Sequence, residues 1–495
     1  MRAPNSSQGL RFGKRRRKLM FVSKLQSSLR TLCVLFVSVV SFPCFGQQIS
    51  RNDRRAEAQI DRFVRQEMVA HQIPGVSLAV LRRGKIVLLK SYGLANVEHQ
   101  VPVKPSTIFQ SGSIGKQFTA AAVMILVQEN KLSLDDKISK YFPDAPPAWK
   151  DITVQHLLTH TSGMGDYPPE IDLQRDYTEG QYFESFKKAP LDFAPGTSWN
   201  YSNIGYATLG FLIRKVTGKY YGDFLQERIF KPLGMTTARI ISEDDIVPNR
   251  AAGYRLVNGQ LKNQAWVSPA TNSTADGSLY LSILDLAKWD AALYSDRLLT
   301  ESSREKIWTR VRLSDGTTKD YGFGWHLAEL HGRRLALHGG AWQGFKSHIV
   351  RFLDTELTLI FLANSWETRD FKFARGLAAC FYPAFALPSV TTIADSDRRT
   401  TTLVRRALMA VSTGKIDEQL FTADARARMT KDIQQHLNAF SLPVAIIHSS
   451  ELVEQKAENN LRVYRYLLTD IGRSLLCTIK LTPDDKISSI ELADV

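Results

Sequence analysis

Residues 113–116 read Ser-Ile-Gly-Lys, residues 201–203 read Tyr-Ser-Asn, and residues 338–340 read His-Gly-Gly. This order of Ser-x-x-Lys, Tyr-x-Asn and His-x-Gly is the most informative feature of the chain. It supplies a nucleophilic serine, two candidate proton carriers and a glycine-containing segment that can approach a bound molecule closely. These are the groups that are needed to acylate a serine and then to release the acyl group.

A Ser-x-x-Lys motif carries little weight alone, because it also occurs at Ser185, Ser303 and Ser412. Only Ser113 and Ser185 precede both other motifs. Ser113 follows a Ser-Gly pair that is typical of a turn and precedes an apolar stretch, residues 118–127, that predicts a helix. We therefore expect Ser113 in the first turn of this helix, where free backbone N–H groups and the helix dipole favour a developing negative charge. Lys116 would lie one turn further on the same face, within reach of the serine hydroxyl.

The chain is similar to the serine β-lactamase-like hydrolases. These include class C β-lactamases, penicillin-binding D-alanyl-D-alanine carboxypeptidases, D-aminopeptidases and related esterases. Beyond the three motifs, the resemblance includes ITVQHLLTHTSG at residues 152–163, FKPLGM at 230–235 and YGFGW at 321–325, and it spans residues 55–385. It implies an α/β fold in which an antiparallel sheet is flanked by helices and carries a helical subdomain. It indicates a family much more specifically than a substrate.

By this resemblance, Ser113 would attack a carbonyl group and form an acyl-enzyme. Lys116 and Tyr201 would act together as proton carriers, because a serine hydroxyl is a poor nucleophile until a neighbour takes its proton. Lys116 can take that proton only if burial or nearby positive charge lowers its pKa from about 10.4. Asn203 would bind the substrate amide or orient Lys116.

Three residues of the last motif complete the expected site. By resemblance, the backbone N–H groups of Ser113 and Ala341 would form an oxyanion hole, and Gly340 would let the strand edge approach the substrate. His338 stands where most β-lactamases have a lysine. Histidine is mostly uncharged at neutral pH and binds a carboxylate less firmly, which argues against efficient hydrolysis of β-lactams. D-amino-acid peptides, esters and β-lactams all remain candidate substrates.

Two other functions remain open. A catalytically weak penicillin-binding or peptidoglycan-sensing module would use the same serine without efficient turnover. His156 and His160 stand four residues apart on a predicted helix, which is a zinc-ligand spacing. The glutamate of His-Glu-x-x-His is missing, however, and no third ligand is evident. We therefore favour packing histidines and expect neither a metal nor another cofactor.

The net charge of +15 is unevenly distributed. Nine lysines and arginines fall in residues 1–46, which contain no acidic residue, so the remainder of the chain carries only +6. A net charge of +6 is too small to indicate a binding surface for a polyanion such as a nucleic acid. We expect a small-molecule or peptide substrate, peptidoglycan fragments included, and no nucleic-acid partner. Peripheral membrane association and the oligomeric state stay open.

Residues 1–46 are typical of an export signal. A basic segment ends at Arg30, an apolar run extends from Leu32 to Phe42, and Gly46 is a small residue suited to cleavage. The run is too short to cross a bilayer, which requires about 20 residues. We expect a periplasmic or secreted protein, with an uncleaved membrane anchor as the alternative.

The remainder divides into a hydrolase domain, residues 50–388, and a C-terminal α+β accessory domain, residues 393–495. The boundary is a proline-containing polar stretch between them. In the first domain, periodicity predicts a helix at 54–71 and strands at 76–81, 85–92, 348–352 and 357–363. In the second it predicts helices at 401–411 and 423–437 and antiparallel strands at 461–468, 474–481 and 487–492. The accessory domain could contact long substrates, support dimerisation or cap the hydrolase domain.

Overall fold

The computed structural model describes residues 51–495 apart from 169, 242–243, 270–273, 278, 396, 413–416, 429–449 and 470–473. The expected export signal lies outside the described residues, and so does the end of the helix expected at 423–437. Within the part that is described, no helix is long and apolar enough to cross a membrane.

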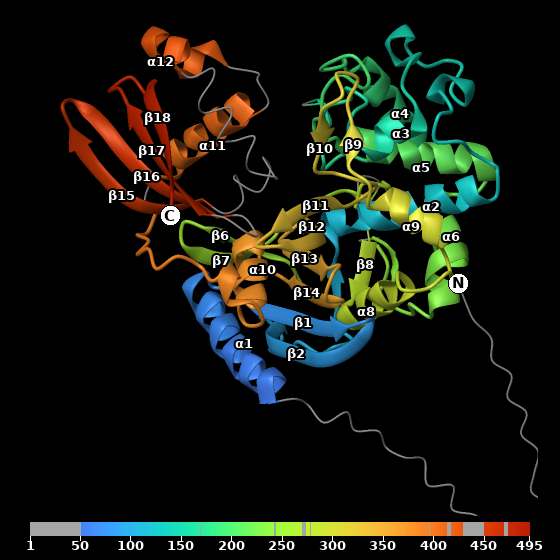
Figure 1. The fold of residues 1–495 in the computed structure, drawn as a ribbon, viewed down its shortest axis with the longest axis horizontal. Coiled ribbons are helices and arrows are strands. Elements are labelled where there is room, and N and C mark those ends of the chain that lie inside the picture. Colours follow the sequence, from blue (N-terminus) through green and yellow to red (C-terminus); the bar gives the residue numbers. More distant parts are fainter. Residues whose placement is uncertain are drawn as a thin grey trace, which may run out of the picture. The chain divides into compact units, whose positions relative to one another are not determined.

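A seven-stranded antiparallel sheet forms the centre of the hydrolase domain (Figure 1), with the strand order β11-β12-β13-β14-β1-β2-β3. The pairing of β1 with β14, for example Val80 opposite Leu359, joins the two ends of this domain. Both strands of the predicted hairpin and both predicted C-terminal strands are present. The strands are β1 (Gly75–Arg82), β2 (Lys85–Asn96), β3 (Val101–Pro102), β11 (His326–Leu330), β12 (Arg333–Trp342), β13 (Phe345–Phe352) and β14 (Leu357–Ala363).

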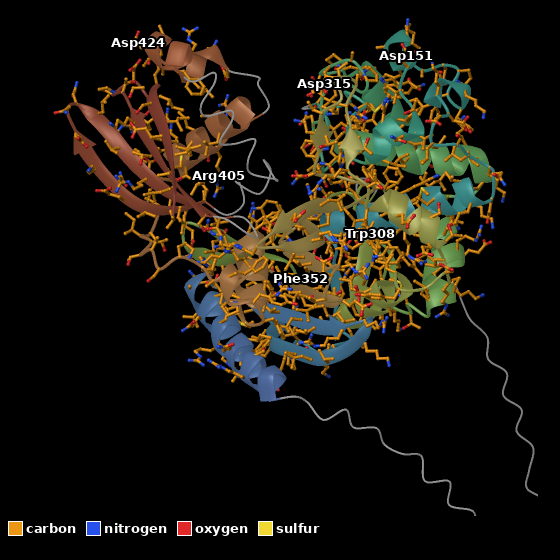
Figure 2. All side chains as sticks on the ribbon, viewed as in Figure 1. Asp151, Trp308, Asp315, Phe352, Arg405 and Asp424 are labelled. Atoms are coloured by element: carbon orange, nitrogen blue, oxygen red, sulfur yellow. The ribbon has the colours of Figure 1, made fainter. Side chains whose placement is uncertain are left out.

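Helices cover both faces of this sheet, which is why β13 and β14 are buried along their whole length. On one face, α1 (Arg51–Ala70) and α10 (Asp370–Ala379) pack on the strands, with Ile60 and Val64 of α1 in the shared core. Phe352, which is labelled in Figure 2, belongs to the same core. On the other face, α2 (Gly115–Gln128) and α8 (Ile283–Ala292) belong to a second, larger core.

The chain between β4 and β11 supplies the helical subdomain and several short strands. Its further helices are α3 (Val154–Leu158), α4 (Glu179–Lys188), α5 (Asn203–Thr217), α6 (Tyr221–Leu225), α7 (Lys231–Leu233) and α9 (Glu301–Ile307). Its short strands are β4 (Ile108–Gln110), β5 (Arg239–Ile240), β6 (Tyr254–Val257), β7 (Gln260–Asn263), β8 (Leu279–Ser282), β9 (Val311–Arg312) and β10 (Thr318–Lys319). The α/β architecture expected from the resemblance is therefore confirmed.

The accessory domain has a four-stranded antiparallel meander with a hydrophobic core of its own. Its elements are α11 (Arg398–Ser412), α12 (Ala423–Arg428), β15 (Ser450–Glu458), β16 (Leu461–Thr469), β17 (Ser474–Leu481) and β18 (Ile487–Asp494). The first strand, β15, was not predicted. Only its beginning is buried, so its sequence lacks a sustained alternation of apolar and polar residues.

Candidate active site

Ser113 lies in a 3-10 turn, η1 (Gly112–Ile114), which runs directly into α2 at Gly115. Ser113 was expected in the first turn of the α-helix, but it lies two residues before the helix begins. Gly112 opens the turn with φ 52°, a left-handed conformation that favours glycine. A Cβ atom at Gly112 would lie 2.4 Å from the Ala341 nitrogen. The turn that carries Ser113 therefore packs directly against β12, and only a glycine fits there.

Lys116 is fully buried and points at Ser113. Its Nζ lies 3.3 Å from Ser113 Oγ, 2.7 Å from Asn203 Oδ1 and 2.5 Å from the Asp276 carbonyl oxygen. Burial lowers the pKa of Lys116 to about 8, whereas the carboxylates of Asp276 and Asp166 act in the opposite direction. A large fraction of this lysine is therefore neutral near pH 8 and able to accept the serine proton.

Tyr201 and Asn203 reach the same point from the start of α5. Ser202 caps this helix by accepting the Gly205 N–H at 2.9 Å. The Tyr201 ring lies 4.8 Å from Lys116 Nζ, and burial raises the pKa of its hydroxyl well above the usual value, while Ser113 lowers it. Tyr201 is therefore protonated at neutral pH. Because Asn203 accepts from Lys116, it orients the lysine, which is one of its two predicted roles.

The two histidines with zinc-ligand spacing do not share a helix, which corrects the prediction. Helix α3 ends at Leu158, and His160 follows it with φ 61°. His156 Nδ1 instead accepts the Thr153 N–H within the capping box of α3. Among the described residues, no group of three or more histidine, cysteine or acidic side chains is arranged to hold a metal.

His160 belongs to the site in another way, which the sequence did not reveal. Its Nδ1 accepts the backbone N–H of Ser202 at 3.0 Å, and its ring lies 4.3 Å from the Tyr201 ring. Burial lowers the pKa of His160 well below the usual value, so the ring stays neutral and keeps this acceptor. His160 thus holds the Tyr-Ser-Asn segment in place. The sequence offered one indication of this role, because His160 lies within residues 152–163, which belong to the family resemblance.

His338 is buried on β12 and is neutral. Burial lowers its pKa to about 3. Its Nδ1 lies 2.6 Å from the Gly339 carbonyl oxygen, and its Nε2 lies 3.1 Å from Tyr321 Oη. This pairing assigns the proton to Nδ1, so that Nε2 accepts from the tyrosine. The rings of His338 and His326 are 5.0 Å apart. Sequence reasoning missed Tyr321 and His326, because only the fold brings them here.

The predicted oxyanion-hole groups come together at the contact between η1 and β12. A Cβ atom at Gly340 would lie 2.0 Å from the Ser111 carbonyl oxygen and 3.0 Å from the Ser113 nitrogen. Gly112 approaches Ala341 in the same way. The backbone of residues 112–113 therefore lies beside that of residues 340–341. Gly340 is therefore required by the packing of β12 on η1, whereas the close approach of this strand to a substrate stays a prediction.

A pocket of about 360 Å³ opens over Ser113. Asn203, Ala341 and Trp342 line it, as do two acidic residues, Asp166 and Asp276. Asp166 accepts from Asn203 Nδ2 at 2.9 Å, and Asp276 accepts from Thr274 at 2.5 Å. The described residues that line this pocket include no lysine or arginine. The pocket wall is therefore negatively charged.

A family model described as Beta-lactamase matches residues 60–381. The chain belongs to the beta-lactamase family. It is 31% identical over 325 residues to a penicillin-binding protein of Bacillus subtilis (strain 168), covering 61% of this chain and 71% of that protein. It is 30% identical over 317 residues to a D-aminopeptidase of Gluconobacter oxydans (strain 621H), covering 62% and 58%. The chain thus spans less than two thirds of that D-aminopeptidase. These relatives identify this beta-lactamase family member as a serine hydrolase.

Solved structures share its fold. An octameric penicillin-binding protein homologue from Pyrococcus abyssi has a TM-score of 0.59 at 22% identity, covering 89% of this chain and 98% of that one. A D-amino acid amidase from Ochrobactrum anthropi SV3, complexed with L-phenylalanine amide, has a TM-score of 0.59 at 24% identity, covering 67% and 100%. Because both identities are below 25%, these two structures show only that this protein has the same fold.

Proposed function

We propose that this family member forms an acyl-enzyme on Ser113 and hydrolyses amino-acid amides or esters that keep a free amino group. The pairing of Ser113 with Lys116 carries the acylation step: Oγ and Nζ lie 3.3 Å apart, and burial lowers the lysine pKa to about 8. A general base works best when its pKa lies near the working pH.

In the proposed reaction, Ser113 Oγ bonds to the carbonyl carbon as its proton passes to Lys116. The carbonyl oxygen becomes an oxyanion, which accepts hydrogen bonds from the N–H groups of Ser113 and Ala341. The bond to the leaving group then breaks, and Lys116 and Tyr201 return the proton to the departing amine or alcohol. Water repeats these steps on the acyl-enzyme, which releases the acid and restores the serine hydroxyl.

The charges of the site support the choice of substrate. Asp166 and Asp276 make the pocket wall negative, which favours a substrate ammonium group over an N-acylated one. His338 is neutral, so it provides no cation for a carboxylate on the leaving group. The relative named D-aminopeptidase supports the same class and the D configuration.

Two substrates that differ only at the amino group test this proposal. We expect D-phenylalanine amide to be hydrolysed with a much higher kcat/KM than N-acetyl-D-phenylalanine amide. Asp166→Asn keeps the size of the side chain but removes its charge. It should raise KM for the free amide about tenfold, the effect of a charged interaction of 1–2 kcal/mol, and should change KM for the N-acetyl amide much less. Equal rates for both amides in the parent enzyme would refute the choice of substrate.

The similarity to a penicillin-binding protein favours a second candidate, a protein that acylates with β-lactams but turns over slowly. Intact-mass spectrometry after addition of benzylpenicillin separates the two. A persistent adduct in the parent but not in Ser113→Ala would favour the penicillin-binding function. Rapid amide turnover with no adduct favours the amidase, and an adduct of equal size on Ser113→Ala would exclude Ser113 as the nucleophile.

We also propose that the protein is exported, to the periplasm or beyond. The basic segment followed by a short apolar run within residues 1–46 supports this proposal. Expression of the whole chain, fractionation of the cells and sequencing of the mature N-terminus test it. A cleaved N-terminus near residue 46 is expected, and an uncleaved protein in the cytoplasmic fraction would contradict export.

A further inference from the structure

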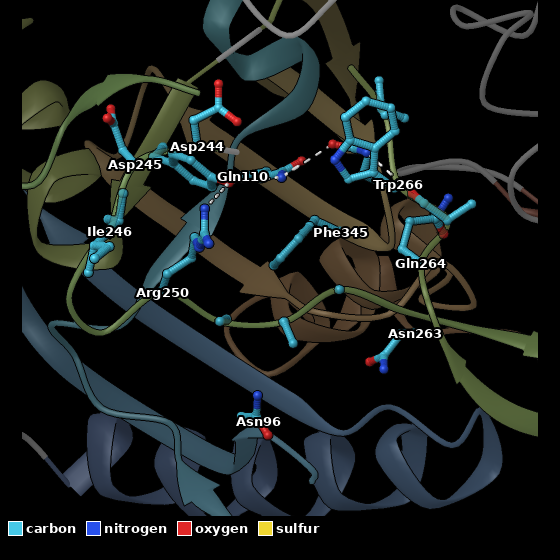
Figure 3. A pocket seen from close by; sticks show the side chains of 18 residues that line it. Asn96, Gln110, Asp244, Asp245, Ile246, Arg250, Asn263, Gln264, Trp266 and Phe345 are labelled. Atoms are coloured by element: carbon cyan, nitrogen blue, oxygen red, sulfur yellow. Dashed lines mark hydrogen bonds between the residues drawn. The ribbon is translucent and has the colours of Figure 1, made fainter. Parts of the chain in front are cut away.

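A second cavity, of about 670 Å³, is drawn in Figure 3. It shares no lining residue with the catalytic pocket. Trp342 lines the catalytic pocket, and the next residue, Gln343, lines the second cavity. Trp342 also packs against a small hydrophobic cluster that includes two residues of the second cavity, Val247 and Tyr280. The two spaces are therefore close together along β12. No step of the proposed reaction uses the second cavity.

Buried polar side chains form the floor of this cavity. Gln110, Gln343 and Tyr280 are only 4%, 8% and 1% exposed, yet all three line it. Gln110 Nε2 lies 3.4 Å from Tyr280 Oη and 3.5 Å from Gln343 Oε1. These contacts are longer than the usual 2.7–3.2 Å, so these bonds are weak. Arg250 also donates to Tyr280 Oη at 3.4 Å, and Gln343 Nε2 donates to the Ala265 carbonyl oxygen at 3.5 Å, so the floor is a network of polar side chains.

The walls combine further carboxamides with an exposed aromatic face. Asn96, Asn263 and Gln264 surround the opening, as Figure 3 shows. Trp266 is 55% exposed, which is unusual for so large an apolar side chain, and it lines the same opening. Five carboxamide side chains thus meet an indole ring around one cavity.

The charges of the lining exclude several ligand classes. Asp244, Asp245 and Arg250 all line the cavity, so the lining has no excess of positive charge. A phosphate-rich ligand or a nucleic acid would need such an excess. A purely apolar ligand would remove water from the carboxamides at the opening, Asn263 and Gln264, without offering them hydrogen bonds, which is costly. The lining therefore suits a ligand that is rich in hydrogen-bonding groups and carries no negative charge.

We propose that this cavity is a binding site for a neutral oligosaccharide. A carboxamide both donates and accepts hydrogen bonds, and so does every sugar hydroxyl. The apolar C–H face of a sugar ring can lie flat on the exposed indole of Trp266, while the hydroxyls reach Gln110 and Gln343. The volume is in the range of sites for ligands larger than a single small group, roughly 300–1,000 Å³. The proposal does not depend on acylation of Ser113.

Calorimetric titration of the whole protein with a neutral probe, chitotetraose, tests the proposal. We expect saturable binding, and we expect Trp266→Ala to weaken it about tenfold or more, as for loss of a central aromatic contact. Trp366→Ala is the matched control, because Trp366 is also exposed, at 43%, and does not line the cavity. Trp266 lies at the surface, so its replacement leaves the core intact. A thermal melt confirms folding of each variant.

Three outcomes would overturn the proposal. The first is no saturable binding of chitotetraose or of cellotetraose up to about 10 mM, a concentration above the millimolar limit of weak specific sites. The second is binding that Trp266→Ala and Trp366→Ala affect equally, which would place the sugar elsewhere. The third is binding of a neutral alanine tripeptide, but of neither sugar, at the Trp266 site, which would make the ligand a peptide. The same titration with Ser113→Ala should give an unchanged affinity, which separates this site from the catalytic one.

Discussion

At the scale of single residues, burial sets the charge state of the whole catalytic group. It lowers the pKa values of Lys116 and His338 and raises that of Tyr201. Burial penalises the charged form of each group, so all three directions have one cause. The consequence is a site in which His338 and Tyr201 are neutral and Lys116 exchanges its proton near pH 8, beside the carboxylates of Asp166 and Asp276.

The first prediction concerns the pH dependence of acylation. If neutral Lys116 is the base, kcat/KM should rise about tenfold per pH unit below its pKa of about 8 and level off above it. His338 has a pKa of about 3, so it should cause no inflection near pH 6.5. An uncharged ester such as p-nitrophenyl acetate is the suitable substrate, because it does not titrate itself. A flat profile between pH 6 and 9 would argue against a lysine base.

The second prediction concerns His160. His160→Leu removes the acceptor for the Ser202 N–H and should lower kcat by about 10-fold or more, in line with the cost of an unsatisfied buried donor. His160→Asn should recover much of this loss, since asparagine offers an acceptor and tolerates the positive φ of this position. The effect should appear in kcat more than in KM. An equal loss in both variants would show that the ring, and not the hydrogen bond, is what matters.

At the scale of elements, periodic segments could be predicted and short or irregular ones could not. Strands β1 and β14 and helix α2 have clear apolar patterns and were found at nearly the correct limits. Strands such as β5, with two residues, are too short for any period. His160 was wrongly placed on a helix, because the end of α3 at Leu158 depends on tertiary contacts rather than on a glycine or proline.

The same distinction applies to the site. Ser113, Lys116 and the Tyr-Ser-Asn segment could be predicted, because their motifs are local in sequence. Tyr321 and His326 could not, because they meet His338 only when β11 pairs with β12. The backbone contact between η1 and β12 joins residues more than two hundred positions apart in the chain, so only the family resemblance could predict it.

That contact gives the third prediction. Gly340→Ala should destabilise the fold by about 1–3 kcal/mol and nearly abolish acylation, because its methyl group would meet the Ser111 carbonyl oxygen at 2.0 Å and force the backbones apart. Gly180→Ala is the control: it lies in α4 with nothing within 4 Å of the new atom. It should stabilise by about 0.5–1 kcal/mol through helix propensity. Urea unfolding and ester hydrolysis measure both. Normal activity of Gly340→Ala would show that the strand need not lie so close.

At the scale of the whole molecule, three buried and neutral histidines lie close together in the hydrolase domain. His160, His326 and His338 all have pKa values that burial lowers, and the rings of His326 and His338 lie 5.0 Å apart. Neighbouring positive charge on Lys116 acts on each of them in the same direction. In an unfolded chain each would titrate near its ordinary pKa of about 6.5. Folding therefore excludes protons that the unfolded chain would bind.

The last prediction follows from the sign of this linkage. Below pH 6.5 the unfolded chain binds more protons than the folded one, so the free energy of unfolding should fall as the pH is lowered. Each histidine contributes up to about 1.4 kcal/mol per pH unit. Urea unfolding between pH 7 and 5 measures this slope before most carboxylates titrate. His326→Phe should reduce the slope by the contribution of one histidine, because burial lowers the pKa of His326 well below its usual value. A slope that this replacement leaves unchanged would mean that His326 is protonated in the folded protein, and its neighbours would then have to accommodate a buried charge.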